Sequence, residues 1–224
     1  MKLLEEYGLS KEQIIKFEKY ANLLLEWNEK FNLTAITKID EIEEKHFIDS
    51  LYLCKYVELD NQRLLDVGSG AGFPGIPLAI AHPKLHVTLL ESNGKKVSFL
   101  KEVIKQLKLS NVDIIQGRAE ELGKRESFDI VTARAVKELN ILLEISYYLV
   151  KVGGVFAAYK SSSVSEEEER AKRAYKSLGI EKVTKYEYNL PNSKDMRVLL
   201  VISKTKTTLK KYPRHYSEIV KSPL

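Results

Sequence analysis

The sequence predicts an α/β fold: a mainly parallel, doubly wound sheet that ends in an antiparallel hairpin and follows an N-terminal helical extension. Three observations support this prediction. From residue 62 onward, short apolar runs alternate with amphipathic stretches, as in a parallel sheet covered by helices. The last two apolar runs, 183–188 and 198–204, have no room for a helix between them, so they predict an antiparallel pair joined through 191–192. The first sixty residues show helical spacing instead.

The N-terminal residues are predicted to form helices that pack on the rest of the chain. Residues 10–13, Ser-Lys-Glu-Gln, match a capping box that opens a helix. Phe17, Ala21 and Leu24 follow at helical spacing and give that helix one apolar face. Residues 38–57 predict a second helical stretch. We expect three parts in the chain: a helical extension over 1–60, an α/β core over 61–204 and a basic tail over 205–224.

Within the core, the alternation gives approximate bounds for each element. Strands are predicted near 62–67, 86–91, 112–116, 128–133 and 154–160. Helices are predicted near 74–81, 95–108, 138–149 and 164–178.

The stretch 64–75 is the most informative part of the sequence. A buried strand is predicted to end at Asp66-Val67, four glycines follow, and Pro74 suits the first turn of a helix. Glycine has no Cβ, so such a loop lets a ligand approach the backbone. Residues 70–75 satisfy G-x-G-x-x-G, a dinucleotide fingerprint that is weak alone. Residues 66–72 satisfy D-x-G-x-G-x-G, the first motif of Rossmann-like S-adenosylmethionine (SAM) methyltransferases, and this pattern accounts for more residues. Glycines that serve only the turn are the structural alternative.

Other candidates follow the ends of the predicted strands, because ligands in open α/β sheets lie beyond the carboxyl ends of the strands. Glu91 ends the second strand, where it either accepts hydrogen bonds from ribose hydroxyls or is an ordinary solvent-facing carboxylate. Ala119 and Glu120 follow the third strand and suit an adenine ring, through a backbone N–H and a side-chain acceptor. Arg134 follows the fourth strand, near the reacting end. Arg118 and Arg134 have structural salt bridges as their alternative role.

The net charge of +5 at pH 7 is concentrated at the C-terminus. Residues 204–224 contain six basic residues and one acidic residue, a balance of six minus one, or +5, so 1–203 are formally neutral. The basic residues are Lys204, Lys206, Lys210, Lys211, Arg214 and Lys221. Such a segment predicts phosphate contacts, and Tyr212 and Tyr216 add rings that can stack on RNA bases. The alternative is a solvated basic tail.

Composition and spacing exclude several classes of protein. No apolar run approaches the roughly 20 residues that a membrane span needs, and the N-terminus lacks the apolar stretch of a secretory signal. The single cysteine, Cys54, excludes an internal disulfide, so we expect a cytoplasmic protein with no membrane partner. The acidic run 166–169 opens a predicted helix, where the dipole favours carboxylates. His46 and His82 lack partners at zinc-ligand spacing, so we predict no metal site.

Specific motifs spread over the chain resemble one family. They are Trp27-Asn28, Asn32-Leu33-Thr34, His46–Leu51, Asp66–Ala79, Gly117–Glu120, Arg134-Ala135 and Tyr212–Arg214. Through them the chain resembles, nearly from end to end, the bacterial RsmG family of 16S ribosomal RNA guanine-N7 methyltransferases, historically called glucose-inhibited division protein B. The family tail often carries a glycine and a further proline after the arginine, where this chain has residues 215–218 instead. The conformation of the tail is therefore left open.

The resemblance implies that the core over 61–204 is a Rossmann-like SAM-dependent methyltransferase core. It implies cofactor contacts from Gly68, Phe73, Ala119, Glu120 and Arg134, to which the loop and strand-end arguments add Gly70 and Glu91. It also implies methyl transfer to N7 of a guanine in the decoding-region loop of 16S rRNA, within the small subunit or an assembly intermediate, with S-adenosylhomocysteine as product. We expect a monomer with RNA contacts from Arg118, Lys160, Lys210, Lys211 and Arg214.

Methyl transfer to guanine N7 needs no general base or protein nucleophile, and the sequence shows no obvious candidate for either. Guanine N7 has a free lone pair and loses no proton when methylated, so no general base is required. No nucleophilic cysteine, Ser–His pair or carboxylate pair stands out in the sequence. Arg134 and Lys160 are predicted to orient a phosphate or guanine O6 and not to act as acids. Positioning of this kind contributes about 7–11 kcal/mol to catalysis.

Two other functions remain open from the residues alone. The fingerprint at 70–75 would suit a nicotinamide-dependent oxidoreductase. A non-catalytic RNA-binding or assembly factor that keeps a vestigial cofactor loop is the second alternative. Thermal stabilisation by NAD and not by SAM would distinguish the oxidoreductase from the methyltransferase. Methyl transfer to unmethylated small subunits would distinguish the methyltransferase from the non-catalytic factor.

Overall fold

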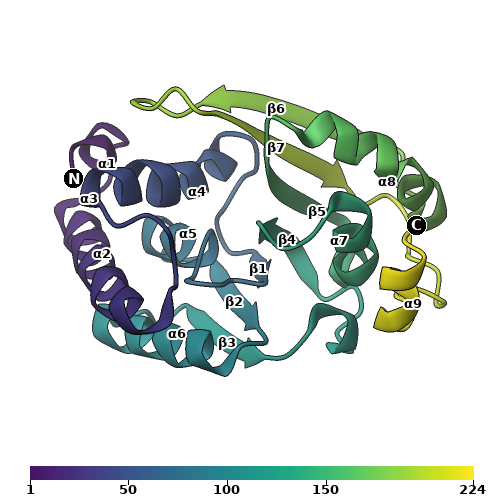
Figure 1. Ribbon diagram of the computed structural model, residues 1–224, viewed down its shortest axis with the longest axis horizontal. Helices are drawn as coiled ribbons and strands as arrows, with labels where there is room; N and C mark the ends of the chain where they lie inside the picture. Colours follow the sequence, from purple (N-terminus) through teal and green to yellow (C-terminus); the bar gives the residue numbers. More distant parts are fainter.

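The computed structural model describes residues 1–224 and is built around one seven-stranded sheet with helices on both faces (Figure 1). The strands are β1 (Arg63–Val67), β2 (His86–Glu91), β3 (Val112–Gln116), β4 (Phe128–Arg134), β5 (Val150–Ser161), β6 (Val183–Asn189) and β7 (Met196–Ser203). Their order is β3-β2-β1-β4-β5-β7-β6. β1 to β5 are parallel, and β7 is antiparallel to β5 and β6. The predicted fold class is confirmed.

The helices also lie close to their predicted positions. The N-terminal ones are α1 (Lys2–Glu6), α2 (Lys11–Phe31), α3 (Ile39–Ile42), the π-helix η1 (Glu43–Ile48), α4 (Asp49–Leu51) and the 3₁₀ helix η2 (Tyr52–Lys55). The others are α5 (Gly75–Ala81), α6 (Gly94–Leu107), η3 (Ala119–Glu121), α7 (Leu139–Ser146), η4 (Tyr147–Leu149), α8 (Val164–Leu178) and α9 (Tyr216–Lys221). The predicted capping box is present, because Ser10 and Gln13 exchange both hydrogen bonds. None of these helices combines the length and apolar character that crossing a membrane requires.

Two boundaries differ from the prediction for local reasons. Helix α5 begins at Gly75 and not at Pro74, and the free N–H of Gly75 donates to Asp66 Oδ2 at 3.0 Å. Strand β5 begins at Val150 and not near 154, because Val150 pairs with Phe128 before an irregularity shifts the register to Val155 opposite Ile130. Bulges of this kind interrupt the apolar pattern from which a strand is predicted.

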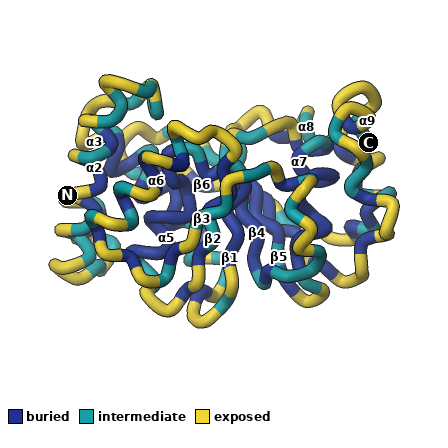
Figure 2. The backbone as a smooth tube through the Cα atoms, turned by 90° about the horizontal axis from the view of Figure 1, so that it is seen from below, coloured by how far each residue is buried: buried dark blue, intermediate teal, exposed yellow.

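Each face of the sheet has its own apolar core. On β1, Leu64 belongs to one core, while Leu65 and Val67 belong to the other. Figure 2 shows these strands as buried backbone between exposed outer turns. A parallel sheet covered on both faces has apolar runs in place of alternation, which is the pattern that the sequence shows.

The N-terminal helices complete the core on the face that α5 and α6 cover. Phe17 and Phe47 pack with their ring centroids 4.9 Å apart, and both are fully buried. Leu4 donates its N–H to Glu43 Oε1 at 3.0 Å, and Tyr7 donates its hydroxyl to the Leu51 carbonyl at 2.7 Å. These contacts join the short first helix to the stretch 39–55.

The same N-terminal helices extend under the β6–β7 hairpin. Tyr52 stacks on Tyr188 at 3.8 Å between centroids, and Tyr159 donates to the Ser50 carbonyl at 2.6 Å. Glu44 Oε1 accepts the backbone N–H groups in the hairpin turn, at 2.5 Å from Asn192 and 2.8 Å from Ser193. The helices therefore cover one face of the sheet from α6 to the hairpin.

The C-terminal segment packs against the opposite face. Tyr212, Ile219 and Leu224 are buried in the core that contains α7 and α8. Lys204 is also buried, and its Nζ lies 3.1 Å from Glu126 Oε1, so this cation is not available for phosphate contacts. The segment is therefore packed on the core from Tyr212 onward, whereas Lys206, Lys210 and Lys211 are exposed, as the solvated-tail alternative expects.

Candidate functional site

The glycine loop 68–73 lies where β1 and β4 run side by side and the sheet reverses its direction of growth, the usual ligand position in open α/β sheets. Gly68, Gly70 and Gly72 all have positive φ, at 65°, 60° and 97°. A Cβ on Gly72 would lie 2.6 Å from the Tyr20 hydroxyl oxygen, so the N-terminal helix packs directly behind the loop. A Cβ on Gly70 would meet no atom closer than 3.8 Å, so this part of the loop faces open space.

Two carboxylates fix the shape of the loop. Asp66 is fully buried, its Oδ2 accepts the Gly75 N–H, and burial raises the pKa of its carboxyl to about 7. Glu91 Oε2 accepts the Gly70 N–H at 2.9 Å, and its Oε1 accepts the Asn93 N–H at 2.8 Å. Each carboxylate oxygen has two lone pairs, so Glu91 retains acceptor capacity for a ribose hydroxyl while it holds the loop.

A cavity of about 130 Å³ opens beside the loop. Strand ends and turns form most of its wall, with Gly68, Leu90, Ala119, Glu120 and Val136 among the lining residues, and Ile145 and Tyr216 close it. Glu120 Oε1 is buried without a hydrogen-bond partner, with Arg118 Nη1 3.7 Å away. Buried acceptors are seldom left unsatisfied, so this atom fits a ligand that brings a donor, as the amino group of adenine does. The residues present therefore fit the nucleoside part of SAM.

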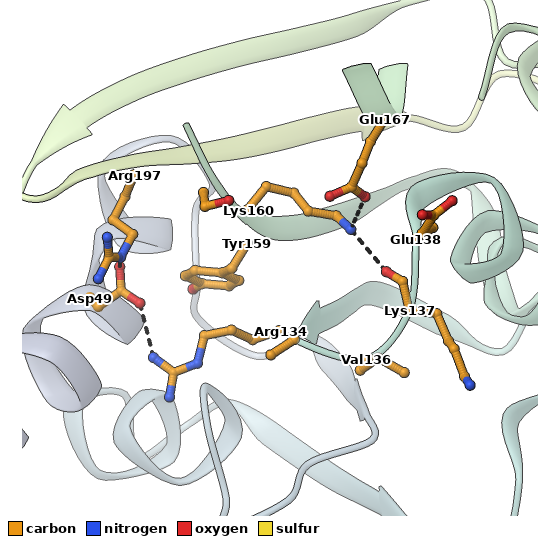
Figure 3. Close-up of a pocket in the computed structure, with 11 residues that line it drawn as sticks. Asp49, Arg134, Val136, Lys137, Glu138, Tyr159, Lys160, Glu167 and Arg197 are labelled. Carbon is orange, nitrogen blue, oxygen red and sulfur yellow. Dashed lines mark hydrogen bonds and ion pairs between the residues drawn. The ribbon is translucent and has the colours of Figure 1, made fainter. Parts of the chain in front are cut away.

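A larger cavity of about 440 Å³ adjoins the first, since Val136 and Lys137 line both. Figure 3 shows that its polar side chains come from different elements and point toward one another in pairs. They are Asp49 from α4, Arg134 from β4, Lys160 from β5, Glu167 from α8 and Arg197 from β7.

Arg134 is held from several directions. Its Nη1 donates to Asp49 Oδ2 at 2.9 Å and to the Lys45 carbonyl at 3.2 Å, and its guanidinium carbon lies 4.9 Å from the centre of the Phe73 ring. Its Nη2 lies 3.2 Å from His46 Nδ1. Arginine only donates, so His46 Nδ1 is the acceptor and the imidazole is neutral. Burial and the Arg134 charge lower the pKa of His46 to about 3, in agreement with that assignment.

Two other cations of the larger cavity, Lys160 and Arg197, also face carboxylates. Lys160 Nζ donates to Glu167 Oε2 at 2.6 Å and to the Lys137 carbonyl at 3.0 Å (Figure 3). Arg197 Nε lies 4.0 Å from Asp49 Oδ1. The lining therefore carries four cations, Lys137 included, and three carboxylates, Asp49, Glu138 and Glu167.

The residues expected to contact RNA are not gathered in one place. Arg118 is half-exposed beside the smaller cavity, and Lys160 is in the larger one. Lys210 and Lys211 are exposed on the C-terminal segment. Arg214 donates from both Nε and Nη2 to Glu144, each at 2.6 Å, so a contact with phosphate competes with this ion pair.

Several residues of the cavities, among them Asp49 and Arg197, had no site role in the sequence-based prediction, and Tyr216 had a different one. Asp49 comes from the N-terminal helices, which carry no strand-end signal. Arg197 opens the antiparallel strand β7 and pairs with Ser161 at the end of β5, so the predicted antiparallel pairing could have placed it at this edge. Tyr216 was expected to stack on RNA, and it lines the smaller cavity. The structure contains no group of three or more histidine, cysteine or acidic side chains arranged to hold a metal ion.

Comparison with known proteins gives a consistent result. A family model described as rRNA small subunit methyltransferase G matches residues 13–194. The ribosomal RNA small subunit methyltransferase G of Lachnoclostridium phytofermentans is 47% identical over 221 residues, which cover 96% of this chain and 91% of that protein. The protein of the same name from Thermoanaerobacter sp. is 46% identical over 227 residues, 98% of this chain and 95% of that one.

Solved structures show the same fold at lower identity. A SAM-dependent methyltransferase from Aquifex aeolicus superposes with a TM-score of 0.56 at 18% identity, over 73% of this chain and 92% of that one. TYW2 of M. jannaschii, solved in complex with AdoMet, gives a TM-score of 0.56 at 21% identity, over 70% of this chain and 74% of that one. The Rossmann-like methyltransferase fold is therefore shared by proteins that differ widely in sequence.

Proposed function

The chain belongs to the rRNA small subunit methyltransferase G family, and we propose on that basis that it transfers the methyl group of SAM to N7 of a guanine in the decoding-region loop of 16S rRNA. One structural observation carries the proposal. A small cavity with an unsatisfied acceptor adjoins a larger polar cavity at the carboxyl edge of the sheet, and Val136 and Lys137 line both. The smaller cavity suits the cofactor, and the larger one suits the guanine.

The cofactor residues are those of the loop and the neighbouring strand ends. Gly68 lines the smaller cavity and offers its backbone to the ligand. Gly70 and Glu91 do not line the cavity, but they are joined by a hydrogen bond beside it, and we assign the ribose hydroxyls to Glu91 and a backbone contact to Gly70. Ala119 and Glu120 meet the adenine edge. Phe73 lines neither cavity and acts less directly: its ring packs against both Arg134 and the His46 ring, the latter 4.4 Å away, and so helps to hold Arg134 in the wall of the larger cavity.

SAM supplies a methyl group on a positively charged sulfur, and the guanine carries that charge after the transfer. A cavity crowded with unpaired cations would oppose this change, because like charges repel in a partly desolvated site. Here Asp49 faces Arg134, and Glu167 faces Lys160, so the cations can donate hydrogen bonds to a phosphate or to guanine O6 without a large excess of positive charge. N7 already has its lone pair free, so the protein needs to position it and need not remove a proton.

The RNA is presented within the small ribosomal subunit or an assembly intermediate, in the cytoplasm, and the protein acts as a monomer. Arg118, Lys210 and Lys211 are the exposed cations that we assign to the RNA backbone. Arg214 contributes only if it exchanges Glu144 for a phosphate. The proposed division of labour is a SAM-binding core over 61–204, flanked by the helices of 1–60 and the basic segment 205–224.

The experiment is to incubate the protein and labelled SAM with small subunits from cells that lack the enzyme, and to map the methylated nucleotide. The matched control is Gly70→Asp, which places a carboxylate in the open space beside the loop and should abolish SAM binding and methyl transfer together. Label at N7 of one guanine of 16S rRNA supports the proposal.

Label at another atom or in another RNA contradicts the substrate assignment. Thermal stabilisation by NAD and none by SAM would instead favour the oxidoreductase alternative, because a ligand at 100 times its dissociation constant adds about 2.7 kcal/mol of stability.

A further inference from the structure

We propose that Tyr216 is a cofactor-binding residue, whose ring forms the wall of the smaller cavity at its purine end, and that the C-terminal segment 205–224 is folded back to place it there. This inference rests on the proposed function, since it names a further contact within the same cofactor site. It also gives the basic segment a role besides contact with RNA.

The position of Tyr216 carries the first step. Its side chain is half-buried and lines the same cavity as Gly68, Ala119 and Glu120, although it lies 96 residues beyond Glu120 in the chain. The Arg118 guanidinium carbon is 5.3 Å from the centre of its ring. An aromatic ring in the same cavity as Glu120 Oε1, which accepts no hydrogen bond, combines a surface for the π-face of a base with an acceptor for its amino group, a pairing that suits a purine.

The second step is how the segment is anchored. Arg214 makes two hydrogen bonds of 2.6 Å with Glu144, which is fully buried in α7. The next residue of α7, Ile145, itself lines the cavity, so the ion pair fixes the segment directly beside the site. Ile219 and Leu224 are buried beyond Tyr216, and the Leu224 carbonyl accepts from Asn140 Nδ2 at 3.3 Å. Tyr216 is thus held on both sides along the chain.

An RNA base is the other ligand that a tyrosine in a basic segment could stack on. The structure favours the cofactor, because the half-buried ring lines a cavity with an unsatisfied acceptor, whereas Lys210 and Lys211 are exposed. Substitution of a ring that contacts the cofactor should weaken cofactor binding without RNA, whereas substitution of a ring that stacks on RNA should weaken RNA binding alone.

The test measures the dissociation constants of S-adenosylhomocysteine and of adenosine by titration calorimetry, with no RNA present. Tyr216→Ala should raise both constants by the same factor, about tenfold, as expected for loss of an aromatic ring beside a base. Tyr216→Phe keeps the ring and should bind almost as the unchanged protein does. Lys221→Ala, on the exposed side of the same helix, is the matched control and should have no effect. Thermal melting of each free protein checks that the variants fold.

Several outcomes overturn the inference. If the folded Tyr216→Ala protein has unchanged dissociation constants for S-adenosylhomocysteine and adenosine, the ring does not contact the cofactor. Weaker binding of the same variant to small subunits would then assign the ring to RNA. Loss of affinity for S-adenosylhomocysteine but not for adenosine would place the ring at the wrong end of the cofactor. If the unchanged protein itself binds no S-adenosylhomocysteine, the proposed function fails first.

The anchoring role of Arg214 has its own test. Arg214→Lys keeps the charge but loses the two-point contact with Glu144, so it should weaken cofactor binding by less than Tyr216→Ala does. If Arg214 acts through Tyr216, the double variant should bind no more weakly than Tyr216→Ala alone, because the two changes remove one effect. Additive losses would show that Arg214 does not act by positioning the ring.

Discussion

The N-terminal helices and the C-terminal segment lie at opposite ends of the molecule and on opposite faces of the sheet, yet both reach the same site (Figure 1). The N-terminal helices reach it by aromatic packing: Tyr20 donates its hydroxyl to the Ala71 carbonyl of the glycine loop, and its ring lies 5.5 Å from that of Phe73. The C-terminal segment reaches it through an ion pair on a buried carboxylate, Arg214 with Glu144. The N-terminal helices therefore pack against the glycine loop, and the C-terminal segment lines the smaller cavity together with Ala119 and Glu120.

The two ends should therefore be destabilised by different substitutions: the N-terminal helices by loss of side-chain volume, and the C-terminal segment by loss of one member of its ion pair. Apolar burial is insensitive to charge but strongly sensitive to lost volume. A buried ion pair tolerates removal of both partners far better than removal of one, because a single partner leaves an uncompensated charge. The following substitutions separate these two cases.

The largest effect is expected from Tyr20→Ala. The ring is fully buried among Phe47, Phe73 and Phe99, so its removal leaves a cavity and should lower the free energy of unfolding by about 3–5 kcal/mol. Urea denaturation measures this change. The control is Ile15→Ala on the same helix, where the side chain is 61% exposed and the change should stay within about 0.5 kcal/mol. A similar small loss for both would show that α2 is not part of the core.

Arg214→Ala comes next, at about 3 kcal/mol, because it leaves the Glu144 carboxylate buried without its partner. The hydrogen bonds with Glu144 raise the pKa of Arg214 above its ordinary value, so the guanidinium group stays charged in the folded protein. The double variant Arg214→Met, Glu144→Leu should recover most of that loss in the same urea experiment. A double variant as unstable as the single one would mean that the side-chain volume matters here and the charge does not.

Acid should destabilise the N-terminal helices through His46, and comparison with His46→Gln separates this effect from that of other groups such as Asp66. The pKa of His46 is about 3 in the folded protein and 6.5 ordinarily, so its contribution to stability is complete above pH 6.5 and is lost as the pH falls toward 3. Between pH 7 and pH 5 this corresponds to about 2 kcal/mol for the wild type relative to His46→Gln. Urea midpoints at both pH values measure the difference, and hydrogen exchange should show the loss in 39–55 before it appears in α9. Equal pH slopes for the two proteins would contradict the assignment of a neutral, buried His46.

The smallest effect on stability is expected from Lys210→Ala with Lys211→Ala, within about 0.5 kcal/mol, because both side chains are exposed. Binding to small-subunit RNA should nevertheless weaken, and the slope of log affinity against log salt should fall by about 1.5, while affinity for SAM stays the same. Lys2→Ala with Lys11→Ala provides the same charge change at the other end of the molecule and should leave the slope unchanged. A slope that is also unchanged in the first variant would leave the C-terminal lysines without a role in binding RNA.

The sequence by itself determined the order of strands and helices, the closing antiparallel pair and the glycine loop. These features depend on residues that are close in the chain: the spacing of apolar side chains sets each element, and a short connection such as that between β6 and β7 permits only an antiparallel neighbour. The loop that follows Asp66 is likewise local, because its glycines adopt the positive φ angles that their residue type allows.

Only the tertiary structure decided which side chains complete the site. Arg134 meets Asp49 across a separation of 85 residues and Arg214 meets Glu144 across 70, and neither pair shares a local pattern. Lys204 counted as one more cation in the sequence, yet it is buried beside Glu126. Such partners are fixed by how the two ends of the chain pack against the sheet, because an ion pair or a cavity wall depends on distance in space and leaves no periodic trace along the chain.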